Sequence, residues 1–350
     1  MGVTTDRAGS VVVDGPAPGA RPLPFLLAVD AGNSKTDIAL VDTAGTVLAT
    51  GRGPGFQPQV TGIAAAFDAI AATLAATRTR AAAAGTPLAA TAAHVSACLA
   101  NADLPVEEAA FAAELGERAW GRSVEVRNDT FAVLRAGLPA GAEPRGVAVV
   151  CGAGINCVGM TPDGRTARFP ALGQISGDWG GGGGLADEAL WFAARAEDGR
   201  GEPTALARAL PEHFGLPTMP ALIEALHLDG IPRTRRHELT PVLFAVAADG
   251  DPVALALVHR QADEVVAMAA VALDRLGLLS EDVPVVLGGS VLAARHPQLH
   301  DRIAERLAAR APRARLTLVT APPVLGAALL GLDAVAAPPE AHATLRAYYG

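Results

Sequence analysis

The chain has few lysines, few cysteines and few aromatic residues, and these shortages argue against several classes of partner and site. Only Lys35 of the 28 basic residues is a lysine, and the net charge is −8. No basic stripe interleaved with aromatic residues occurs, which argues against a nucleic-acid partner. The three cysteines, Cys98, Cys151 and Cys157, are odd in number and lack metal-ligand spacing. This usage favours a reducing compartment and hence the cytoplasm.

Long runs of strongly apolar residues are also lacking. The longest uncharged run, residues 81–102, is built from Ala, Thr, Gly, Pro and His rather than Leu or Ile, so no membrane partner is expected. It predicts a helix end, a turn and a buried strand. Residues 1–23 are rich in Gly, Pro and Ala without periodicity, which predicts a flexible leader without secretory features. The remaining chain, half hydrophobic overall, is long enough for two domains.

Two segments have the same pattern of a buried strand, a turn of small residues and a second strand. They are residues 26–36, LLAVDAGNSKT, and residues 147–156, VAVVCGAGIN. Turns with so little side-chain bulk leave backbone N–H groups exposed, and with a nearby hydroxyl or ammonium they bind anions. Two such turns predict a polyphosphate site, and Lys35 supplies a compact positive charge in the first of them.

The order of elements around these turns is duplicated. Strands are predicted at 25–31, 36–42 and 46–51, followed by a helix at 61–84, a strand at 91–99, a helix at 106–120, a strand at 124–126 and a helix to 136. After a Pro/Gly-rich break at 138–145, strands recur at 146–151, 156–160 and 166–169, then helices, strands at 283–287 and 316–320, and a last helix at 324–332. This order predicts an α/β protein with two domains, 24–137 joined by a C-terminal helix at 324–350, and 138–323.

Five motifs, taken in order, resemble those of the N-acetylglucosamine kinase and BadF/BadG-type ATPase family. They are DAGNSKT at 30–36, Asn128-Asp129, CGAGINC at 151–157, GDWGGGGG at 177–184 and Gly288-Gly-Ser290. The resemblance covers about residues 25 to 335. It implies duplicated actin-like domains, of the ribonuclease H-like type, with a cleft between them.

The resemblance implies ATP and Mg²⁺ as cofactors. Asp30 is expected to contact Mg²⁺ through water. The expected nucleotide contacts are Gly32, Asn33, Ser34, Lys35 and Thr36 in the first turn, Gly152, Ala153 and Gly154 in the second, Gly288, Gly289 and Ser290 at the adenosine, and Ala247 beside the adenine. An ordinary hairpin turn is the alternative for the first motif, and Ala153 replaces the threonine frequent in the family.

The resemblance also implies a sugar substrate, with N-acetylglucosamine or glucosamine as the first expectation. Asp129 is the expected general base for a sugar hydroxyl, and a helix N-cap is its alternative role. The other expected sugar contacts are Gln57, Asn128, Ala171, Leu172, Gly173 and Asp178. Gln57 stands where the family has Asn, and the five glycines at 180–184 are expected outside any element interior, with a flexible linker as the alternative.

Two other functions stay open on the sequence. A BadF-type activator ATPase would need thiolate ligands for an iron–sulfur cluster, and the three cysteines offer no convincing set. A non-catalytic sugar or nucleotide sensor is the second, although no DNA-binding helix pair is evident. The oligomeric state is open as well, with a homodimer as one option.

Overall fold

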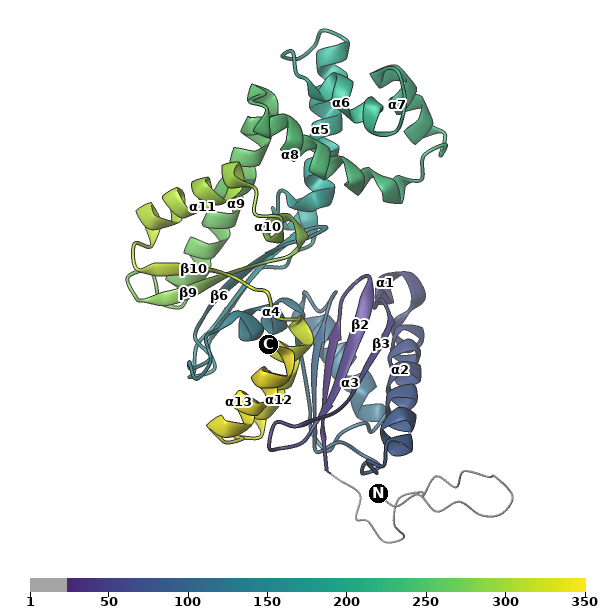
Figure 1. The fold of residues 1–350 in the computed structure, drawn as a ribbon, viewed down its shortest axis with the longest axis vertical. Helices are drawn as coiled ribbons and strands as arrows, with labels where there is room; N and C mark the ends of the chain where they lie inside the picture. Colours follow the sequence, from purple (N-terminus) through teal and green to yellow (C-terminus); the bar gives the residue numbers. More distant parts are fainter. Residues whose placement is uncertain (1–23) are drawn as a thin grey trace, which may run out of the picture. The chain divides into compact units, whose positions relative to one another are not determined.

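The computed structural model describes residues 24–350, so the predicted leader at 1–23 lies outside the described residues. Contacts divide the chain into two compact units, the first ending at Ala132 and completed by Pro322–Gly350, the second comprising Val133–Ala321. The boundary falls inside helix α4 (Thr130–Gly137). Each unit contains one five-stranded sheet with helices packed against it (Figure 1).

The sheet of the first unit has the strand order β3-β2-β1-β4-β5. β1 pairs antiparallel with β2 and β2 with β3, whereas β1–β4 and β4–β5 are parallel. The strands are β1 (Leu26–Ala31), β2 (Lys35–Val41), β3 (Val47–Pro54), β4 (His94–Leu99) and β5 (Val124–Asn128). The helices are α1 (Pro58–Thr61), α2 (Ile63–Ala83), α3 (Pro105–Glu117), α12 (Pro323–Ala334) and α13 (Pro339–Tyr349).

The second sheet has the order β10-β9-β6-β7-β8, which reproduces the first with β6 in the place of β1. The strands are β6 (Gly146–Cys151), β7 (Ile155–Met160), β8 (Thr166–Arg168), β9 (Val283–Gly288) and β10 (Ala314–Leu318). Their pairing senses match as well, with β6–β7 and β7–β8 antiparallel and β6–β9 and β9–β10 parallel. The predicted α/β class and the duplicated strand order are therefore confirmed.

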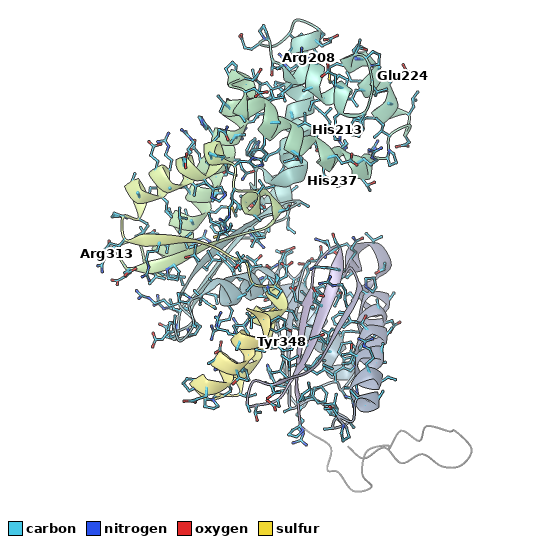
Figure 2. All side chains as sticks on the ribbon, viewed as in Figure 1. Arg208, His213, Glu224, His237, Arg313 and Tyr348 are labelled. Atoms are coloured by element: carbon cyan, nitrogen blue, oxygen red, sulfur yellow. The ribbon has the colours of Figure 1, made fainter. Side chains whose placement is uncertain are left out.

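Helices form a large part of the second unit. They are η1 (Gly173–Ser176), α5 (Gly181–Glu197), α6 (Leu206–His213), α7 (Met219–His227), η2 (Arg233–Glu238), α8 (Leu239–Ala248), α9 (Pro252–Arg275), α10 (Ser290–Ala293) and α11 (Pro297–Arg310). Figure 2 labels side chains of α6, α7 and η2, among them Arg208, Glu224 and His237. Within the described chain no single helix is long and apolar enough to cross a bilayer; the stretch Arg233–Ala248 reaches that length and composition only together with α9, at a bend of 112°.

The buried strands explain why each sheet forms where it does. All six residues of β1 and of β4 are buried, a pattern typical of strands covered on both faces. One face of the first sheet packs against α2 and α3 through side chains such as Leu27, Val29 and Phe67. Figure 1 shows α2 and the yellow helix α12 on opposite faces of this sheet.

The prediction of one C-terminal helix at 324–350 is wrong in one respect. Two helices, α12 and α13, occupy this stretch, and the chain between them contains Ala336 in the left-handed region, at φ 51°. Pro338 and Pro339 then begin α13, where a missing N–H costs no helical hydrogen bond.

Candidate active site

The first glycine turn connects β1 to β2. The N–H of Gly32 donates to the Lys35 carbonyl at 2.9 Å, which closes the turn. Among residues 24–350, the N–H groups of Asn33 and Ser34 have no backbone or side-chain acceptor. Successive backbone N–H groups left in this state can bind an anion, as the sequence predicts.

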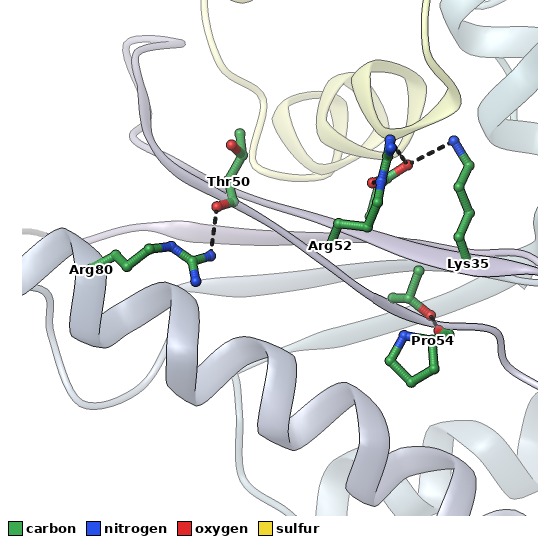
Figure 3. Close-up of polar contacts among 7 residues, drawn as sticks. Lys35, Thr50, Arg52, Pro54 and Arg80 are labelled. Carbon is green, nitrogen blue, oxygen red and sulfur yellow. Dashed lines mark hydrogen bonds and ion pairs between the residues drawn. The ribbon is translucent and has the colours of Figure 1, made fainter.

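The structure gives two of the predicted phosphate ligands, Thr36 and Lys35, protein partners. Thr36 is buried, and its hydroxyl donates to the Pro54 carbonyl at 2.8 Å. The Lys35 ammonium lies 3.2 Å from an Asp37 oxygen, with half of the lysine side chain exposed (Figure 3). The Thr36 hydroxyl therefore holds β3 in place, while Lys35 stays near the turn in an ion pair.

Asp37 is also bound by Arg52, through hydrogen bonds of 2.6 and 3.1 Å. Partial burial raises the pKa of Asp37, but the hydrogen bonds from Arg52 and Lys35 outweigh it and leave the pKa below its usual value. Asp37 consequently stays ionised.

Strand register aligns five ionisable side chains in one row across the sheet. Cα partners in neighbouring strands present their side chains to the same face. The row runs through Arg52 on β3, Asp37 on β2, Asp30 on β1, Cys98 on β4 and Arg127 on β5. It places Asp30 at the centre of the sheet, one residue before the end of β1.

Asp129 follows β5 and belongs to the same electrostatic environment as Asp30. Burial raises the pKa of Asp30 well above its usual value, and the negative charge of Asp129 raises it further. Burial also raises the pKa of Asp129, to about 6, although hydrogen bonds from the N–H and hydroxyl of Thr130 lower it. A carboxyl group with a pKa near neutrality suits general base catalysis at physiological pH.

Asn128, predicted to contact the sugar, is the last residue of β5 and is buried. Its amide nitrogen donates to Asp103 at 2.8 Å, and its amide oxygen accepts from the N–H of Thr130 at 3.0 Å. These bonds fix the start of α4 and the backbone of Asp129. In the structure, Asn128 thus holds Asp129 in position.

Gln57 lies beside the first turn, in a loop that a buried aromatic cluster anchors. Phe56 contacts Phe67 and Phe111 edge to face, with ring centroids 5.2 and 5.3 Å apart. The Gln57 amide nitrogen donates to the Asn33 carbonyl at 2.8 Å, and Phe56 N donates to the Gly32 carbonyl at 2.9 Å. The loop and the turn therefore form one unit.

Sequence reasoning missed Asn101 in this network. Its amide nitrogen lies 3.0 Å from both the Asn33 side-chain oxygen and the Phe56 carbonyl. The residue adopts φ 63°, a left-handed conformation that Asn tolerates better than most residues. Its place two residues after the end of the buried strand β4 is the one signal that could have revealed it.

The second glycine turn joins β6 to β7, and the start of α5 holds it. Gly182 N donates to the Gly152 carbonyl at 2.7 Å, and Gly183 N to the Ala153 carbonyl at 2.9 Å. Because the turn directs carbonyls toward the helix, the N–H groups of Ala153 and Gly154 are left without a recorded acceptor in the described residues. This arrangement parallels the first turn.

The expectation that residues 180–184 lie outside an element interior is wrong for four of the five. Gly180 caps α5, and Gly181 to Gly184 form its first turn. A Cβ at Gly181, where φ is 75°, would lie 2.5 Å from Gly154, and one at Gly289 would lie 2.4 Å from the Cys151 backbone. These glycines are needed because the turn is clamped between two backbones.

The remaining predicted sugar contacts of the second unit lie in the loop around η1. Leu172 N donates to the Ser176 hydroxyl at 2.8 Å, and Asp178 N to the Gly173 carbonyl at 3.1 Å. The Ser176 hydroxyl also bonds to the Asp178 carboxylate. With Ala171 at φ 53°, the loop presents Asp178 in a fixed position.

The predicted adenosine contacts lie at the end of β9. Gly288 is the last residue of this strand, Gly289 caps α10 and Ser290 begins it. Ala247 in α8 is 2% exposed, so its side chain is enclosed by protein in the structure.

All three cysteines are buried. Burial raises the pKa of the Cys98 and Cys157 thiols, and it raises the pKa of Cys151 to about 12. These raised pKa values disfavour thiolate ligands for an iron–sulfur cluster.

Two sheets of the same strand order, each with a glycine turn after its central strand, define the actin-like class of ATPase folds. A model of the BadF/BadG/BcrA/BcrD ATPase family matches residues 27–331. The chain belongs to this family.

Similar proteins point in the same direction. An N-acetyl-D-glucosamine kinase of Dictyostelium discoideum is 27% identical over 213 residues, 59% of this chain and 65% of that one. An N-acetylmuramic acid/N-acetylglucosamine kinase of Clostridium acetobutylicum is 28% identical over 156 residues, 44% of this chain and 51% of that one. The chain thus matches less than two thirds of the length of either relative.

One solved structure extends the likeness over nearly the whole fold. It comes from Chromobacterium violaceum and carries the name N-acetylglucosamine kinase as a provisional assignment. The TM-score is 0.65 at 27% identity, covering 89% of this chain and 99% of the other. The similarity in fold therefore extends over nearly the whole of that solved chain.

Proposed function

We propose that this protein is an ATP-dependent kinase that transfers the γ-phosphoryl group of ATP to a hydroxyl of an amino sugar. N-acetylglucosamine or glucosamine is the proposed substrate, since N-acetylglucosamine occurs in the names of the relatives. The observation that carries the proposal is the position of Asp129, which directly follows β5 and lies close enough to the buried Asp30 for its charge to raise the pKa of that carboxyl, in a chain of this family.

The proposed reaction needs a proton acceptor. As the sugar oxygen bonds to the γ-phosphorus, the bond from phosphorus to the β,γ-bridging oxygen breaks and ADP leaves. The hydroxyl proton passes to the Asp129 carboxylate, which is ionised above a pH of about 6. Asn128 positions this carboxylate by holding the start of α4.

The two glycine turns are the proposed phosphate contacts. Each turn has a pair of N–H groups without recorded acceptors in the described part of the chain, at Asn33 and Ser34 and at Ala153 and Gly154. Gly288, Gly289 and Ser290 would contact the adenosine. Asp178 and Gln57 would bind sugar hydroxyls through the carboxylate and amide that the loops hold in place.

The residues around Asp30 fit a divalent cation. Burial raises the pKa of Asp30, the negative charge of Asp129 raises it further, and a bound cation would stabilise the ionised form of Asp30 against both effects. Asp30 would hold Mg²⁺ through water, as no group of three potential ligand side chains is gathered within residues 24–350. When bound, Mg²⁺ would neutralise charge on the phosphates.

A coupled assay of ADP release over a panel of sugars tests the proposal. The panel contains N-acetylglucosamine, glucosamine, glucose and N-acetylmuramic acid, each with and without Mg²⁺. Release that depends on an amino sugar and is lost in Asp129→Asn is the expected result. Equal release with and without sugar would contradict a kinase and favour an activator ATPase.

A further inference from the structure

A cavity of about 680 Å³ lies in the second unit beside the loop that carries Asp178. Its wall contains residues of η1, the segment before α5, the first three turns of α5, and Arg260 of α9. Asp178, the proposed sugar contact, belongs to this wall. A group attached to a sugar at Asp178 could therefore extend into the cavity.

The three carboxylates of this wall each have a hydrogen-bond or ion-pair partner. The carboxylates of Asp178 and Glu188 accept hydrogen bonds, from Ser176 and from Trp179 Nε1 respectively. A third carboxylate, Asp187, lies 2.8 Å from Arg236. The hydrogen bonds from Ser176 and Trp179 orient two of these carboxylates without cancelling their charge, and Arg236 balances the charge of Asp187.

Arg260 differs from the carboxylates. Its guanidinium carbon lies over the Trp179 ring, 4.1 Å from the centroid. It forms no recorded ion pair or hydrogen bond with any residue in the described range. A contact with a ring uses none of the N–H donors of a guanidinium, and their forked arrangement is suited to bidentate bonding of a carboxylate.

Building on the proposed function, we propose that the cavity binds a carboxylate-bearing substituent of the amino sugar through Arg260. The Trp179 ring holds the guanidinium through this contact, and the indole N–H bond to Glu188 fixes Trp179 in turn. Asp178 would hold the sugar ring while Arg260 holds the acidic group. The preferred substrate class is then an N-acetylhexosamine with an acidic ether side chain.

The experiment compares N-acetylmuramic acid with its methyl ester, which has nearly the same shape but no charge. The expected ratio of kcat/KM, acid over ester, is about tenfold, as a charge-assisted hydrogen bond allows. In Arg260→Gln the ratio should fall to near one through a higher KM for the acid. Arg208→Gln, at an exposed position of α6 in the same unit (Figure 2), is the matched control and should keep the wild-type ratio.

A wild-type ratio near one, or the same ratio in Arg260→Gln, would overturn the inference while leaving the kinase intact. If no sugar supports ATP turnover, the proposed function fails instead. Calorimetric binding of N-acetylmuramic acid to wild type and to Arg260→Gln then decides the inference separately. Weaker binding in the variant supports the site, and equal binding overturns it.

Discussion

Replacing Asp129 by Asn should have opposite effects on stability and on turnover. Asp129 is poorly hydrated in the folded protein, so its pKa is about 6 instead of 3.8. A shift of this size corresponds to about 3 kcal/mol at most, at 1.36 kcal/mol for each pKa unit. The charged form of Asp129 therefore destabilises the folded state.

The raised pKa of Asp129 determines the pH range over which its effect on stability changes. A group whose folded pKa is raised binds its proton more tightly when folded, so its contribution to stability is present below pH 3.8 and is lost as the pH rises through about 6. Between pH 4.5 and 7.5 this loss amounts to about 2 kcal/mol. Asp129→Asn lacks the titration, so its free energy of unfolding should exceed that of wild type by more at pH 7.5 than at pH 4.5.

Urea unfolding of both proteins at the two pH values measures this difference. Glu117→Gln, an exposed carboxylate of the same unit, is the control and should show no such pH-dependent gain. Turnover should fall by about 10²- to 10⁴-fold in Asp129→Asn, the usual contribution of a general base. A variant with near-normal turnover, or with the same stability difference at both pH values, would refute the reasoning.

Four further predictions concern the two turns, Lys35 and the cysteines. Gly181→Ala should weaken ATP binding at least about tenfold because its Cβ would collide with Gly154, whereas Gly184→Ala, with open space at its Cβ, should keep ATP affinity and raise the melting temperature slightly; equal affinities by calorimetry would argue against the clamp. Asn101→Gly keeps the left-handed backbone but removes the amide, so KM for ATP and sugar should rise several-fold, and unchanged kinetics would remove Asn101 from the site. Lys35→Gln should change unfolding free energy by less than about 1 kcal/mol because Arg52 still binds Asp37, so a large loss of turnover would assign Lys35 to phosphate and no loss would leave it structural. Native protein should be colourless, iron-free and resistant to iodoacetamide, since all three cysteines are buried; stoichiometric iron would favour the activator.

The strands were predictable because their signal is local. β1, β4 and β6 are short runs of buried apolar residues with small residues after them, and the turn after β1 could be located to within a residue. The duplicated order then followed from repeating the same reading along the chain. Asp129 was placed correctly between β5 and α4, because the boundary lies at a polar pair.

The errors involve residues whose partners are distant in sequence. Glycines are poor helix formers, yet Gly182 and Gly183 are helical because their N–H groups bond to carbonyls about thirty residues earlier. The bonds of the Thr36 hydroxyl to Pro54 and of Arg52 to Asp37 depend on the register of β2 and β3, which no local pattern reports. Asn101 acts through the side chains it meets across the fold.

Phosphorus NMR of the reaction products tests the central claim most directly. Wild-type protein with Mg²⁺, ATP and N-acetylglucosamine should form one sugar phosphomonoester, detected by its coupling to sugar protons, in an amount equal to the ADP formed. Formation of ADP with inorganic phosphate alone, and no sugar ester for any sugar of the panel, would contradict phosphoryl transfer to an amino sugar.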